Sequence, residues 1–134
     1  MALRFIKTIS VLLSLMSAST IVFASPKTIP CPPLTSIQQA AQSMDLALRQ
    51  DDGTYYVGRR YHQRSFENEH ALWHVSVDSI LAKSEVEAIT LGKEILKNVS
   101  FKKNETATEG HANKLYLCQY GRGNISALGF SISN

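Results

Sequence analysis

The stretch LWHVSVDSILAKSEVEAITLGKEILKNV, residues 72–99, decides the fold, because it contains the clearest strand and the clearest helix of the chain. In its first part, Trp73, Val75 and Val77 alternate with polar residues, which is typical of a β-strand with one buried face over 72–81. In its second part, apolar residues recur every three or four positions, which predicts an amphipathic helix of about four turns. The stretch therefore indicates a protein of mixed α and β structure.

Clear signals bound the predicted helix. Ser84 stands at the N-cap, and Glu87, three residues later, completes a capping box. Lys93 and Lys97 lie toward the C-terminal end, where the helix dipole favours positive charge. Gly92 lies in the middle, where glycine costs about 1 kcal/mol relative to alanine. Its presence there predicts that another element packs closely against the helix.

Further strands are predicted on both sides of this stretch. Residues 54–66 are rich in aromatic and β-branched side chains and form a predicted strand, with a bulge at Gly58. The turn 67–70 would join it to the strand at 72–81 as a hairpin. After the helix, 114–120 and 125–132 alternate around a Gly-Arg-Gly-Asn turn and predict a final hairpin.

The segment before these strands predicts a second helix. Over 36–50, apolar residues form one stripe at helical spacing: Ile37, Ala40, Ala41, Met44 and Leu48. Thr35 and Ser36 are candidate caps, and 51–53 supplies a stop and a turn. The polar segment 100–113 predicts a mobile loop. The predicted fold class is α+β, in the order α-β-β-α-β-β, with an antiparallel sheet and both helices packed on one face.

The first 24 residues have the layout of a secretory signal peptide. Arg4 and Lys7 give a positive start, 9–23 carries no charge, and cleavage is expected after Ala24. The apolar run is diluted by serines and is shorter than the roughly 20 residues that cross a bilayer. We therefore predict an exported protein, periplasmic or secreted, with no stable membrane insertion after cleavage.

Cleavage leaves one domain, 25–134, with 25–35 as an extended proline-rich leader. Of the 14 basic residues, 12 remain against 11 acidic ones, so the net charge falls to about +1 and nucleic-acid binding loses its support. Cys31 and Cys118 both lie in the exported part, where an even number of cysteines predicts a disulfide bond. The chain lacks the C-x-x-C motif that a redox-active pair favours.

Candidate catalytic and metal-binding residues are few. His70 and His74 have the spacing of a metal pair on a helix, but they lie at a predicted strand. His74, Ser76 and Asp78 include the residue types of a hydrolase triad, yet alternate strand residues lie roughly 6.6 Å apart. Triad members instead converge within about 3 Å from separate elements. We expect no catalytic residue, no metal site and no cofactor.

Aromatic and arginine residues gather in the predicted strand at 54–66, and such side chains contribute disproportionately to interfaces. The predicted partner-binding residues are Tyr55, Tyr56, Arg59, Arg60, Tyr61 and Arg64. An ordinary amphipathic strand would explain the same composition. The sequence predicts a non-catalytic exported binding protein with a protein partner. The alternative is a small secreted hydrolase, or an inhibitor of a secreted or host enzyme.

A set of scattered positions carries a resemblance to a known group. These positions are Cys31-Pro32, Ile37, the strand around Trp73, and LYLCQY at 115–120 followed by Leu128. By them the chain resembles the small, uncharacterised exported proteins found in Legionella-like intracellular bacteria. The resemblance implies a paired cysteine and a small α+β body, and it transfers no catalytic residue. The chain departs from that group at 69–71, where Glu-His-Ala replaces a glycine-rich approach to the tryptophan.

Overall fold

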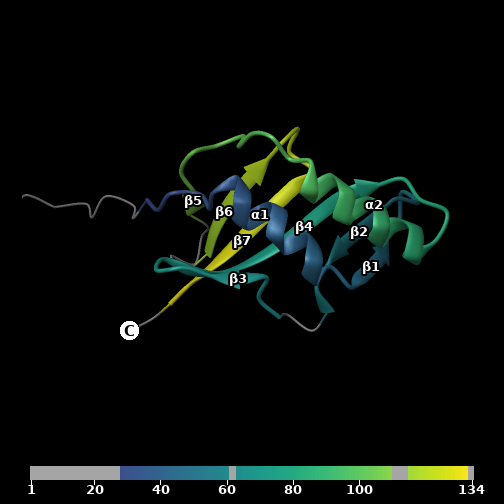
Figure 1. Cartoon of the computed structure of the whole chain (residues 1–134), viewed down its shortest axis with the longest axis horizontal. Helices are drawn as coiled ribbons and strands as arrows, with labels where there is room; N and C mark the ends of the chain where they lie inside the picture. The colour runs from purple at the N-terminus through teal and green to yellow at the C-terminus, as the bar shows by residue number, and fades with distance from the viewer. Residues whose placement is uncertain (1–27, 61–62, 110–114, 133–134) are drawn as a thin grey trace, which may run out of the picture.

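Strand β4 (Ala71–Ile80) lies in the middle of a seven-stranded antiparallel sheet (Figure 1). The computed structural model describes residues 28–60, 63–109 and 115–132, and the predicted signal peptide lies outside these ranges. Across the sheet the strands follow the order β1 (Leu46–Arg49), β2 (Tyr55–Gly58), β4, β7 (Ile125–Ser131), β6 (Leu115–Tyr120) and β5 (Thr108–Glu109). Strand β3 (Phe66–Glu67) also pairs with β4.

The alternation predicted for β4 is confirmed. Trp73, Val75 and Val77 are buried, whereas His74 and Ser76 are partly exposed. Successive side chains of a strand point to opposite faces, so one face of β4 belongs to the core and the other does not. The predicted final hairpin is also confirmed, because β6 and β7 pair along their length.

Both helices lie on one face of the sheet (Figure 1). Helix α2 (Glu85–Lys97) packs against β1, β2 and β4, and α1 (Leu34–Ala40) packs against α2. The predicted cap is present, because the Ser84 side chain accepts a hydrogen bond from the Glu87 N–H at 3.1 Å. A Cβ added to Gly92 would lie 2.9 Å from Cγ1 of Val57, which confirms the predicted close packing. No helix among the described residues is long and apolar enough to cross a membrane.

The predicted helix over 36–50 is wrong beyond its first turns. Helix α1 ends at Ala40, a 3₁₀ turn (Ala41–Ser43) follows, and the remaining residues form β1. Strand β1 pairs residue by residue with β2, through a turn in which Gly53 has a φ of +84°. The four residues of β1 are too few for their apolar spacing to distinguish a helix from a strand. Their pairing with β2 makes them a strand. The N-cap of α1 is Pro33, not the predicted hydroxyl residues.

The predicted single strand over 54–66 is divided into β2 and β3. Both pieces pair with the same edge of β4, and the segment between them leaves the sheet. Ser65 joins this segment to β4: its N–H donates to the Trp73 carbonyl, and its Oγ accepts from the Val75 N–H. The bulge predicted at Gly58 is misplaced, because the irregularity in the β2–β4 pairing falls between Tyr55 and Val57. The turn 67–70 does join β3 to β4, as predicted.

The described part of the predicted mobile loop, 100–109, is paired with its neighbours. It contains β5, and Lys102 forms an isolated bridge with Tyr120. Ala107 is buried, and its N–H donates to the Ile29 carbonyl in the leader. The observed order is therefore α1-β1-β2-β3-β4-α2-β5-β6-β7, not the simpler predicted one.

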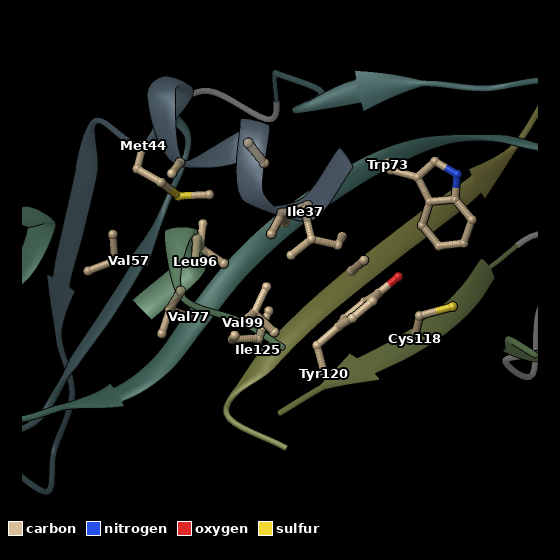
Figure 2. Packing of buried hydrophobic residues seen from close by; sticks show 14 of the residues in the cluster. Ile37, Met44, Val57, Trp73, Val77, Leu96, Val99, Cys118, Tyr120 and Ile125 are labelled. Atoms are coloured by element: carbon tan, nitrogen blue, oxygen red, sulfur yellow. The ribbon is translucent and has the colours of Figure 1, made fainter. Parts of the chain in front are cut away.

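The predicted disulfide between Cys31 and Cys118 is confirmed, with a Cα–Cα distance of 5.7 Å. It fixes the leader to β6 on the side of the sheet that carries the helices. Figure 2 shows Trp73, Tyr120 and Cys118 in the same layer of buried side chains. The helices, the leader and the segment 99–107 together complete the cover of this face.

Tyr120 ties the sheet to the leader and makes stability depend on pH. Its phenol donates a buried hydrogen bond to the Pro32 carbonyl at 2.7 Å. Burial raises the pKa of Tyr120 above its ordinary value of 10.0, and the nearby Glu105 carboxylate adds to the rise. The folded chain therefore keeps this phenol protonated where the unfolded chain ionises. Its stabilising contribution is complete below about pH 10 and is lost as the pH rises further.

We expect Tyr120→Phe to lower the free energy of unfolding by about 1–3 kcal/mol at neutral pH, because the Pro32 carbonyl loses its buried partner. The same variant should lose less stability than the wild type above about pH 10. Urea denaturation at neutral and alkaline pH measures both effects. Tyr56→Phe is the comparison variant, because it removes a partly exposed hydroxyl that contacts His74 instead of the buried one that contacts Pro32. Equal alkaline losses in wild type and Tyr120→Phe would contradict this role.

Candidate functional site: an uncovered face of the sheet

The sheet face opposite the helices carries apolar side chains in register. Three rows cross β4, β7 and β6, namely Leu72, Phe130 and Leu115, then His74, Leu128 and Leu117, then Ser76, Ser126 and Gln119. We call these nine residues the uncovered face, because no helix that the structure describes lies over them. Phe130 is 46% exposed and Leu117 is 38% exposed. The first two rows are thus mostly apolar, and the third is polar.

A pocket of about 510 Å³ opens at the β4 side of the apolar rows. Its lining residues are Tyr56, Arg64, Leu72, Trp73, His74, Leu128 and Phe130. Tyr56 comes from β2 and Arg64 from the segment between β2 and β3, so both stand beside the surface formed by β4 and β7. The volume lies in the range of about 300–1,000 Å³ that small-molecule sites occupy.

A second pocket, of about 400 Å³, adjoins the first. It is lined by Arg59, Gln63, Arg64 and Leu72, of which Arg64 and Leu72 also line the first pocket. We call the first the apolar pocket and the second the arginine pocket. Their shared walls place an apolar hollow directly beside a cationic one.

His74 holds the rim of the apolar pocket in place. Its Nε2 lies 3.3 Å from the Tyr56 hydroxyl, and its Nδ1 lies 3.3 Å from the Gln63 carbonyl oxygen. A carbonyl oxygen only accepts, so Nδ1 donates to Gln63, and in the neutral imidazole Nε2 then accepts from the tyrosine hydroxyl. His74 therefore fixes Tyr56 and the segment after β2 against the sheet.

The two arginines of the arginine pocket have different partners. A guanidinium N–H of Arg59 donates to the Arg64 carbonyl, which closes the segment on itself. The Arg64 guanidinium lies 3.3 Å from the Glu67 carboxylate, in an ion pair whose side chains are 60% and 47% exposed. Such an exposed pair contributes only about 0–1 kcal/mol. Both guanidinium groups therefore remain available to a competing anion.

The structure separates the six residues of the predicted partner-binding set. Tyr56, Arg59 and Arg64 come together at the two pockets. Tyr55 does not join them, because it is only 8% exposed and belongs to the core on the opposite face. Arg60 is exposed, and its backbone N–H donates to the Asp45 carboxylate. Tyr61 lies outside the described residues.

The apolar half of the site was missed in the sequence. Leu72, Leu128 and Phe130 lie within predicted strands, yet nothing singled them out as parts of a site. The available signal was the presence of apolar residues at both alternating positions, as in Leu115-Tyr116-Leu117 and Ala127-Leu128. A strand with one wet face carries apolar residues at only one set of positions.

The residue types of metal and hydrolase sites do not form such sites in the part of the chain described. No group of three or more His, Cys, Asp or Glu side chains gathers there in a geometry for a metal ion. His70 lies 3.2 Å from the Glu69 carboxylate. His74 is engaged by Tyr56 and Gln63, while Asp78 accepts from the N–H of the following residue. The described residues therefore show no hydrogen-bonded link among His74, Ser76 and Asp78.

Comparison with known proteins gives no family: no family model, curated protein or solved structure matches the chain. The uncovered face and the segment beside it combine exposed apolar side chains, two guanidinium groups and two adjoining pockets.

Proposed function

We propose that this is an exported, non-catalytic binding protein that holds a protein partner on the uncovered face. The observation that carries the proposal is the exposure of Phe130 and Leu117 on a sheet face with no helix among the described residues to cover it. Contiguous exposed apolar surface of this kind marks interaction sites. An inhibitor of a secreted or host enzyme would be one form of such a protein.

Apolar side chains on an exposed sheet face are unfavourable in water. An antiparallel sheet commonly exposes one face to solvent, but that face then carries polar side chains. Here only the row formed by Ser76, Ser126 and Gln119 follows that rule. Covering apolar surface contributes about 25 cal/mol per Å² removed from water, before the costs of association. A partner that covers the two apolar rows gains this energy.

Export to the periplasm or beyond is part of the same proposal. The disulfide between Cys31 and Cys118 supports it, because such bonds persist in oxidising compartments and are rare in the cytosol. A paired cysteine and a small α+β body also accord with the proposed kinship to the small exported proteins of Legionella-like bacteria.

We expect Phe130→Glu to reduce partner capture at least about tenfold, because it places a charge at the centre of the apolar rows. The immobilised mature protein would be exposed to periplasmic extract or culture fluid, and the bound proteins quantified by mass spectrometry. Val86→Glu is the matched control, since Val86 is 75% exposed but lies on α2. Thermal unfolding followed by circular dichroism checks that both variants fold. Equal capture by wild type and Phe130→Glu would contradict the proposal.

A further inference from the structure

We infer that the partner inserts an apolar side chain into the apolar pocket and places a carboxylate between Arg59 and Arg64 in the arginine pocket. The inference rests on the proposed function, because it concerns the same face and the same partner. Its basis is the adjacency of the two pockets, which share Arg64 and Leu72 as walls. One occupant can therefore fill both at once.

The apolar pocket suits an aliphatic or aromatic group. Leu72, Leu128 and Phe130 supply its sheet wall, and the Tyr56 side chain from β2 also lines it. Both ring nitrogens of His74 are already engaged, so the imidazole adds an aromatic surface. At many protein interfaces a few side chains, most often aromatic residues or arginine, account for most of the binding energy and lie in well-packed, desolvated pockets.

The arginine pocket suits a carboxylate. Among its described lining residues are two arginines and Gln63, and none is acidic. A guanidinium has five N–H donors in a planar fork, so Arg59 keeps donors beyond the one directed at the Arg64 carbonyl. Arginine and carboxylate groups pair in a bidentate geometry that adds direction as well as energy. The Arg64–Glu67 pair is exposed and is replaced at little cost.

A protein fits this surface better than a small acid does. Leu115 and Leu117 belong to the apolar rows but lie outside the lining of both pockets. A small molecule that filled the pockets would leave the exposed Leu117 in water. A protein segment reaches across β7 to β6 and covers the pockets and Leu117 together.

Phenylbutyrate, its primary amide and phenylbutylamine test the chemistry, because they share one apolar body and differ in charge. Each would be titrated into the ¹⁵N-labelled mature protein with its disulfide intact. We expect phenylbutyrate to bind roughly fivefold more tightly than the amide, and the amine to bind most weakly. Amide signals of Leu72 and Leu128 should shift, and that of Val86 should not. Equal binding of the three probes, or shifts confined to other surfaces, would overturn the inference.

Charge variants test which groups select the carboxylate. Arg59→Gln combined with Arg64→Gln should abolish the preference for phenylbutyrate over its amide. Glu67→Gln should increase that preference, because it removes the competing carboxylate beside Arg64. Arg122→Gln, at an exposed position in the turn between β6 and β7, is the matched control and should change nothing. An unchanged preference in the double variant would overturn the assignment of the arginine pocket.

Competition separates this inference from the proposed function. Saturating phenylbutyrate should release the partner captured by the wild-type protein, whereas the amide at the same concentration should release less. If phenylbutyrate binds at Leu72 and Leu128 but the partner stays bound, the pockets serve a small acid and the inference about the partner is wrong. If Phe130→Glu abolishes capture but the probes show no charge preference, the proposed function stands and the inference fails.

Discussion

Replacing Cys31 and Cys118 together by serine is expected to lower the free energy of unfolding by about 4–5 kcal/mol. The bond joins residues 87 positions apart, and the chain-entropy model gives a large effect for so long a loop. Domains of this size are stable by only about 5–15 kcal/mol, so the variant should be marginal at 37 °C. Equilibrium urea denaturation under non-reducing conditions measures the loss.

The leader should remain in contact with the sheet in this variant under native conditions. The Cys31 N–H donates to the Glu105 carbonyl, and the Ala107 N–H donates to the Ile29 carbonyl, independently of the sulfur atoms. Reductant should destabilise the wild type but leave the double variant unchanged, which supplies the control. A double variant within about 1 kcal/mol of the wild type would contradict the expected constraint on the unfolded chain.

Trp73→Ala is expected to cost about 3–5 kcal/mol of unfolding free energy. The indole is fully buried, and its Nε1 donates to the side-chain oxygen of Asn68 at 3.0 Å. That oxygen also accepts from the N–H groups of His70 and Ala71, so Trp73 joins the core to the β3–β4 turn. Urea denaturation again gives the value, and a loss below about 1 kcal/mol would contradict this packing.

The contact between Trp73 and Gly129 provides an internal control. A Cβ at Gly129 would lie 2.8 Å from Cζ3 of the indole, closer than real Cβ atoms approach. Gly129→Ala should therefore cost about 1–3 kcal/mol in the wild type. In a Trp73→Ala background the ring is absent, so the same change should cost at least about 1 kcal/mol less. Additive losses in the double variant would show that the two residues do not compete for this space.

The sequence predicted strand β4 and the start of helix α2, because both depend on residues that are close together in the chain. The alternation around Trp73 and the Ser84 cap each involve neighbours within a few residues, and both are confirmed. Strand β1 depends on its pairing with β2, and its four residues are too few to show the alternation of apolar and polar side chains that indicates a strand. The pairing of Ala107 with Ile29 and of Cys31 with Glu105 joins the segment 100–109 to the leader, far away in the chain. Those contacts leave no local signature.

The sequence also predicted only part of the candidate site, namely its tyrosine and arginine residues. Composition marked Tyr56, Arg59 and Arg64, which do meet at the pockets. Composition could not show that Tyr56 lies on the face of the pockets and Tyr55 in the core. The face that each side chain occupies depends on which edge of β2 pairs with β4. The position of Phe130 beside Leu72 depends on the β4–β7 register, which joins distant segments. The apolar half of the site therefore became visible only in the folded chain.

Site-specific photo-crosslinking tests the central claim most directly. A photoreactive amino acid would replace Phe130 or Leu117 on the uncovered face. The control carries it at Val86 on α2. Each variant would be expressed in the cell that naturally produces the protein and irradiated after export. We predict one covalent partner adduct from positions 130 and 117 and none from position 86. The same adduct from position 86, or no adduct from either position on the uncovered face, would contradict the claim that this face holds a partner.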